Sequence, residues 1–205
     1  MNHLAHFLLA GDNEGLRVGA LLGDYLKGPL RQNLPREIEH GVRLHRRIDA
    51  FTDDHPRNRT ARSRFAEQRR LAGIVLDMYY DHFLSLHWER FHDQPLTLFS
   101  AGVLDTLETH RAFLSADALK FSQRLREYGI LERYHDIGFI HEALRRIGLR
   151  LRREAAMESA IEVAATQHQR LEQDFLGFFP ELVAFSACER VLPDVQGSPA
   201  DQQTI

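Results

Sequence analysis

The sequence predicts an all-α protein, a multi-helix bundle in a single domain. Apolar residues recur three or four positions apart along most of the chain. No segment alternates apolar and polar residues between hairpin turn signals. Proline separates periodic segments at Gly28-Pro29, His55-Pro56 and Asp93-Gln94-Pro95, where it disfavours a continued helix. Together these features favour helices joined by short turns.

The periodic segments divide most of the chain into predicted helices. In order, they span Asn13–Lys27, Pro35–Asp53, Pro56–Arg69, Leu71–His92, Leu96–Phe113, Ala116–Tyr128, Ile137–Ala155, Ala156–Phe175 and Pro180–Leu192. After Leu192 the composition turns to Pro, Gly, Gln, Ser and Asp, which predicts a disordered tail over residues 193–205. We therefore expect one helical domain over residues 1–192.

Composition excludes several classes of protein. A chain of 205 residues with 43% hydrophobic residues can bury one substantial core. Its formal net charge of −3 predicts no global field for binding nucleic acid or a membrane. Cys188 is the single cysteine, which excludes an internal disulfide and a Cys-rich zinc site, so we expect a cytoplasmic protein. The apolar run Leu4–Leu9 is too short for a signal peptide, and no apolar stretch approaches the ~20 residues that span a bilayer.

The predicted helix Pro35–Asp53 carries polar residues on its apolar face. His45 and Asp49 share that face with Ile38 and Val42, whereas the charged residues lie opposite. Burying a carboxylate is costly unless a cation, a strong donor or a metal accompanies it. Asp49 is therefore a candidate for a functional site.

The predicted helix Leu71–His92 gives a sharper signal. Between Leu71 and Leu86 it is apolar nearly all the way round, which is typical of a helix surrounded by protein. Asp77 and Asp81 are four positions apart and share one face, with His82 turned by about 100°. Two carboxylates stacked in an interior repel each other unless a divalent cation lies beside them.

Other polar residues extend this set. Asp24 ends an apolar turn beside Gly23, and His3 and His6 are three positions apart, so they can share a helix face. A mixture of imidazole and carboxylate donors suits Mn²⁺, Mg²⁺ or Fe²⁺. A lone buried histidine or aspartate is more often a satisfied core residue, so the prediction rests on the whole set. Its members are Asp24, His45, Asp49, Asp77, Asp81 and His82.

These residues stand within motifs that resemble one known family. The motifs are Met1-Asn2-His3-Leu4-Ala5-His6, Gly23-Asp24, His45-Arg46-Arg47-Ile48-Asp49, Thr52-Asp53, Leu76-Asp77 and Asp81-His82-Phe83-Leu84. They resemble acyl carrier protein phosphodiesterase, and the resemblance extends to about Leu192, more loosely in the second half. That family is similar to a divergent, rearranged HD-type phosphohydrolase, although this chain has Asp81-His82 where the common HD pattern has His-Asp.

The resemblance implies an HD-like fold and a specific activity. The expected enzyme is a Mn²⁺-dependent phosphoric diester hydrolase that removes 4′-phosphopantetheine from holo acyl carrier protein, which is its partner and substrate. Asp24, His45, Asp77, Asp81 and His82 are the expected metal ligands, with Asp49 as a further ligand or the partner of one, and Arg46 as a phosphate-binding residue. Two alternatives stay open: an HD-type hydrolase of a nucleotide or another small phosphodiester, and a non-catalytic helical binding module.

Overall fold

A computed structural model describes residues 1–30, 34–65 and 67–191 of the chain. In these residues the prediction of an all-α fold is confirmed, because α-helices and two short 3-10 helices are the regular elements and no strand is present. The α-helices are α1 His3–Ala10, α2 Glu14–Leu22, α3 Arg36–Asp54, α4 Pro56–Ser63, α5 Arg69–Leu86, α6 Leu96–Thr109, α7 Ala116–Glu127, α8 Ile130–Arg133, α9 Ile137–Leu151, α10 Glu154–Thr166 and α11 His168–Glu189. The 3-10 helices are η1 Trp88–Arg90 and η2 Arg111–Phe113. Leu192 and the predicted tail lie outside the described residues.

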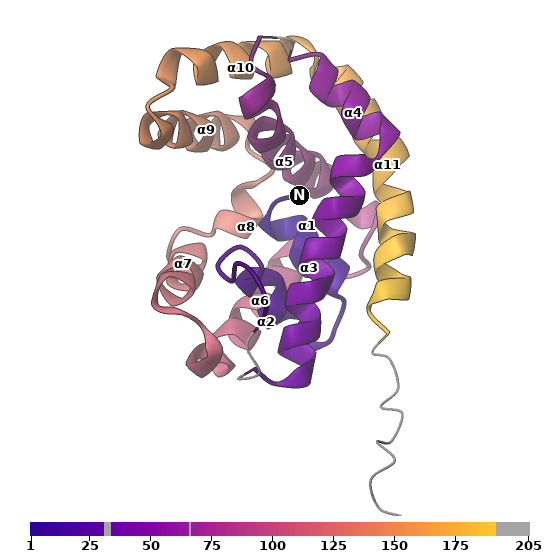
Figure 1. The fold of residues 1–205 in the computed structure, drawn as a ribbon, viewed down its shortest axis with the longest axis vertical. Coiled ribbons are helices and arrows are strands. Elements are labelled where there is room, and N and C mark those ends of the chain that lie inside the picture. The colour runs from indigo at the N-terminus through magenta and orange to yellow at the C-terminus, as the bar shows by residue number, and fades with distance from the viewer. Residues whose placement is uncertain (31–33, 66, 192–205) are drawn as a thin grey trace, which may run out of the picture.

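Helix α5 occupies the middle of the molecule (Figure 1). It contacts α1, α4, α9, α10 and α11, and its apolar side chains from Leu71 to Leu84 are largely buried. Helices α3 and α11 run along one side, α9 and α10 lie at one end, and α6 and α7 lie towards the other (Figure 1). The prediction that this helix is surrounded by protein is therefore confirmed, and residues on α5 are well placed to contact several other elements.

Glycines allow α2 and α3 to pack very closely. A Cβ atom added at Gly19 would lie 2.4 Å from the carbonyl oxygen of Ile38 and 2.5 Å from the Cα of Gly41. A Cβ at Gly41 would lie 2.6 Å from the carbonyl oxygen of Leu16. Both positions therefore need glycine, because only the absent side chain allows the two backbones to touch.

Several predicted helix boundaries are wrong. Helix α1 was not among the predicted helices, although its Leu4–Ala10 side chains are buried. The predicted break at Ala155 lies instead after Leu151, where Arg152 adopts a left-handed conformation with φ of 55°. Helix α11 continues through Pro180, where a break was predicted. Phe178, Phe179 and Leu182 are buried around that proline, so apolar packing offsets its missing N–H group.

Within the described part of the chain, no helix combines the length and the apolar character needed to cross a membrane.

Candidate functional site

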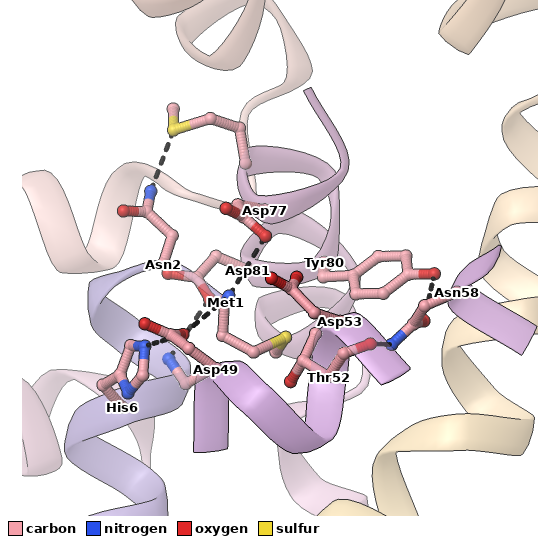
Figure 2. Close-up of polar contacts among 12 residues, drawn as sticks. Met1, Asn2, His6, Asp49, Thr52, Asp53, Asn58, Asp77, Tyr80 and Asp81 are labelled. Carbon is pink, nitrogen blue, oxygen red and sulfur yellow. Dashed lines mark hydrogen bonds and ion pairs between the residues drawn. The ribbon is translucent and has the colours of Figure 1, made fainter. Parts of the chain in front are cut away.

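Three helices and one turn bring histidines and carboxylates together near the N-terminus. Figure 2 shows His6 of α1, Asp49 of α3 and Asp77 of α5 converging beside Met1. His45, one turn before Asp49 on α3, completes the centre of this cluster. Donor atoms of His6, His45 and Asp49 all lie within 4.8 Å of one another. We call these three residues the histidine–aspartate cluster.

The ring of His45 is held in one orientation. Its Nδ1 lies 2.8 Å from the carbonyl oxygen of Ala20 on α2, and a carbonyl can only accept, so Nδ1 carries the hydrogen. The other ring nitrogen, Nε2, lies 3.2 Å from Oδ2 of Asp49. In neutral imidazole this Nε2 has no hydrogen to donate. The contact therefore needs either an imidazolium or a cation between the two groups.

His6 stacks on His45 and contacts the same carboxylate. The ring centroids are 3.8 Å apart and the rings are nearly parallel, at 14°. His6 Nε2 lies 3.1 Å from Oδ1 of Asp49, and its buried Nδ1 has no hydrogen-bond partner among the residues that the structure describes. Burial, and then the neighbouring His45, lower the pKa of His6 to about 4. His6 is therefore neutral near pH 7, which is the form that binds metals.

Asp49 is a charged acceptor at the edge of the core. Its side chain is 42% exposed, so the expectation of a buried Asp49 is wrong, because α3 leaves this edge of its apolar face open. Partial burial acts to raise the pKa of Asp49, but the contacts with His45 and His6 hold that pKa well below its usual range. Asp49 therefore remains ionised and accessible to a ligand.

Asp24 joins the cluster from the turn that follows α2. Its Oδ1 lies 3.7 Å from His45 Nε2, and its Oδ2 lies 3.5 Å from His3 Nδ1. Gly23 makes this approach possible, since a Cβ there would lie 2.2 Å from Cγ of His45. The structure therefore brings together the predicted residues Asp24, His45 and Asp49, and it adds His3 at the rim.

The α-amino group of Met1 lies between Asp77 and Asp49. Its nitrogen is 3.0 Å from Oδ1 of Asp77 and 3.4 Å from Oδ1 of Asp49 (Figure 2). Burial acts to lower the pKa of this amine, but Asp77 and Asp49 raise it to about 10. The Met1 ammonium therefore lies beside Asp77, where the sequence predicted a divalent cation.

Asp77 and Asp81 lie in different surroundings although they share a helix face. The Asp77 side chain is 36% exposed, whereas Asp81 is fully buried. Asp81 accepts hydrogen bonds from the backbone N–H groups of Leu4, at 2.7 Å, and Ala5, at 3.2 Å. Burial raises the pKa of Asp81 to about 7, although the two backbone hydrogen bonds oppose this. The structure thus places Asp81 beneath the first turn of α1.

Two predicted site residues make contacts outside the cluster. His82 donates its Nδ1 hydrogen to the carbonyl oxygen of Tyr134, 2.8 Å away, and its ring packs against Tyr79 and His168. Arg46 donates from Nη2 to the carbonyl oxygen of Leu26, 2.7 Å away. The structure does not bring His82 to the cluster, and it shows Arg46 holding the segment after α2.

Sequence reasoning left His6 out of the predicted ligands. The available signal was the spacing of His3 and His6 inside the apolar segment His3–Ala10. That His6 is buried against Asp49 could not be judged without the position of α3, which supplies that carboxylate. A helix of eight residues also gives a weak periodic signal.

The donor set of the cluster fits a divalent cation. Imidazole and carboxylate together suit Mn²⁺ or Fe²⁺, and no thiolate is present among these residues. A ligating histidine normally donates its other N–H to a carbonyl or carboxylate, as His45 does to Ala20. The fold and the candidate site therefore define a helical protein with a histidine–carboxylate centre that could hold a divalent cation.

Comparison with known proteins identifies the family. The family model described as acyl carrier protein phosphodiesterase matches residues 1–182. The chain is 34% identical to the acyl carrier protein phosphodiesterase of Salmonella dublin, covering 91% of this chain and 98% of the relative. It is 34% identical to the Escherichia coli K12/DH10B protein of that name, over 90% and 96%, and 30% identical to that of Pectobacterium atrosepticum, over 93% and 100%.

This chain belongs to the acyl carrier protein phosphodiesterase family, a family of phosphoric diester hydrolases. The resemblance seen in the sequence motifs is thereby confirmed. No solved structure matches the chain significantly.

Proposed function

We propose that this protein hydrolyses the phosphodiester between 4′-phosphopantetheine and a serine of holo acyl carrier protein, with Mn²⁺ as its metal and Mg²⁺ or Fe²⁺ as alternatives. The products are apo carrier protein and free phosphopantetheine. The names of the relatives support the substrate. The single cysteine supports a location in the reducing cytoplasm. In that compartment the enzyme would encounter a carrier protein of lipid synthesis.

The observation that carries the proposal is the contact of His45 with Asp49. Nδ1–H of His45 is committed to Ala20, so the lone pair of Nε2 points at a carboxylate 3.2 Å away. A divalent cation held by His45, His6 and Asp49 would satisfy both groups at once. Asp24 and Asp77 lie next to these residues, where they can act as further ligands or hold the ligating groups in place.

Each part of the reaction has a residue to support it. A bound divalent ion supplies Lewis acidity, which lowers the pKa of water and offsets charge on the phosphoryl oxygens. Asp49 and Asp24 remain close to His45 and can orient the attacking water. Arg46 uses one N–H group on Leu26. Its remaining donors can bind the phosphoryl oxygens.

The test compares two buried histidines that make the same backbone contact. His45 and His82 each donate Nδ1–H to a carbonyl oxygen 2.8 Å away, but only His45 belongs to the cluster. We expect His45→Ala to lose bound Mn²⁺ and His82→Ala to keep it, as measured by elemental mass spectrometry. Cleavage is followed by mass spectrometry of holo carrier protein incubated with enzyme and Mn²⁺.

Three results would contradict the proposal. Retention of metal by His45→Ala together with its loss from His82→Ala would move the site to His82. Hydrolysis of bis(p-nitrophenyl) phosphate without cleavage of holo carrier protein would favour a small phosphodiester as substrate. Failure of the wild-type protein to bind Mn²⁺, Mg²⁺ or Fe²⁺ would favour a binding module.

A further inference from the structure

Asp81 is buried at the point where α1 meets α5. The hydrogen bonds from Leu4 N–H and Ala5 N–H, at 2.7 and 3.2 Å, engage different oxygens of its carboxylate. These amides belong to the first turn of α1, where N–H groups have no acceptor within the helix. The two donors are also buried. Asp81 thus satisfies buried groups that would otherwise be unpaired.

The residue that precedes a helix often caps its first N–H groups, but in α1 that residue, Asn2, has other partners. Asn2 precedes α1 but makes no side-chain capping hydrogen bond. Its Nδ2 donates instead to the hydroxyl of Tyr134, at 2.9 Å, and to the sulfur of Met78, at 2.8 Å. A carboxylate is favourable at the N-terminus of a helix because it faces the positive end of the helix dipole. Asp81, which belongs to α5, therefore caps α1 in place of Asn2.

The first turn of α1 carries the histidines of the site. His3 immediately precedes Leu4 and reaches Asp24, whereas His6 immediately follows Ala5 and reaches Asp49. The backbone segment between these histidines is the segment that Asp81 binds. Any movement of that turn therefore moves His3 relative to Asp24 and His6 relative to Asp49.

From this geometry we infer that Asp81 is a positioning residue, which fixes the first turn of α1 and thereby sets His3 and His6 towards Asp24 and Asp49, and that it is not itself a metal ligand. This role rests on the proposed function, because it concerns the same metal site. Each oxygen of Asp81 already accepts a hydrogen bond from a buried amide, and Asp81 is fully buried, whereas Asp49 and Asp77 present partly exposed carboxylates to a ligand.

The first experiment uses the wild-type protein and measures amide hydrogen exchange by mass spectrometry with residue-resolving fragmentation. We expect the amides of Leu4 and Ala5 to be protected in metal-free protein and to stay protected when Mn²⁺ is added. A loss of their protection on adding Mn²⁺ would show that Asp81 leaves them for the metal, and would overturn the inference. This arm needs no variant to fold.

The second experiment compares Asp81→Asn with Asp174→Asn. Asp174 is a largely buried carboxylate that pairs with Arg64, away from the cluster. We expect Asp81→Asn to speed exchange at Leu4 and Ala5 and to weaken Mn²⁺ binding by about 10-fold to 100-fold, the usual effect of losing support behind a ligand. Asp174→Asn should change neither quantity. Unchanged exchange at Leu4 and Ala5 in Asp81→Asn would overturn the inference.

A double substitution separates a positioning role from direct ligation. If Asp81 acts through α1, Asp81→Asn should weaken Mn²⁺ binding far less in a His6→Ala background than in the wild-type protein. Equal, additive losses in both backgrounds would contradict the inference. Failure of the wild-type protein to bind Mn²⁺ would overturn the proposed function itself, which makes the two failures distinguishable.

Discussion

Replacing Gly19 with alanine tests the close packing of α2 against α3. The new Cβ would lie 2.4 Å from the carbonyl oxygen of Ile38 and 2.5 Å from the Cα of Gly41. Ordinary contacts of a Cβ begin at about 3.4 Å, so the helices must separate by about 1 Å. The obstructing atoms belong to the backbone of α3, so a rotation of one side chain cannot relieve the overlap.

The expected cost follows from overpacking. Inserting a methyl group into a well-packed interior typically costs about 1–3 kcal/mol, and the higher helix propensity of alanine returns about 1 kcal/mol at most. Because the obstructing atoms are backbone, we take the upper end of this range and expect a net loss of about 2 kcal/mol. At about 2–4 °C per kcal/mol for a protein of this size, the melting temperature should fall by about 4–8 °C.

Gly102→Ala is the matched control. Gly102 lies within α6, and a Cβ there would meet no atom of the described part of the chain within 4 Å. Alanine should therefore stabilise the protein by up to about 1 kcal/mol through helix propensity alone. Circular dichroism melts of both variants, with chelator present so that metal binding cannot contribute to stability, give the comparison. A Gly19→Ala protein that melts at or above the wild-type temperature would refute the reasoning.

Three further predictions concern single residues. Under the proposed function, Arg46→Ala should bind Mn²⁺ as the wild type does but lower kcat, and Arg46→Lys should recover little of the lost kcat because lysine lacks paired donors. Metal analysis and steady-state kinetics check both. Phe178→Ala should lose about 3–5 kcal/mol in urea denaturation because Phe178 is fully buried, whereas Val191→Ala, at an exposed position, should stay within about 0.5 kcal/mol. Burial lowers the pKa of His82, so as the pH falls below about 6.5 the unfolded chain takes up a proton that the folded chain does not, and stability declines. Between about pH 7.5 and pH 5.5, the melting temperature of the metal-free wild-type protein should therefore fall further than that of His82→Gln. Equal decreases in the two proteins would contradict the role given to His82.

The sequence was sufficient for the fold class and for the proximity of two residues of the candidate site. Helical periodicity places His45 and Asp49 on one face of α3, and the structure confirms that they are neighbours, 3.2 Å apart. The apolar residues of α5 correctly indicate a helix surrounded by protein. These features depend on spacing within one helix, which the sequence states directly.

Features that depend on contacts between helices could not be predicted in the same way. Asp77 and Asp81 share a face of α5, but one lies beside an ammonium at the rim and the other beneath α1. His82 follows Asp81 directly, yet it faces Tyr134. Which side of a buried helix meets which neighbour is decided by tertiary packing, and periodicity carries no information about it.

The hydrogen bond between Leu4 and Asp81 also has a consequence for synthesis. It joins residues 77 positions apart, and at about 5–20 residues per second a ribosome needs about 4–15 s to add that length of chain. An isolated helix as short as α1 is marginal in water. The buried amides of Leu4 and Ala5 therefore have no Asp81 to accept their hydrogen bonds until α5 has been synthesised, so the first turn of α1 is completed late.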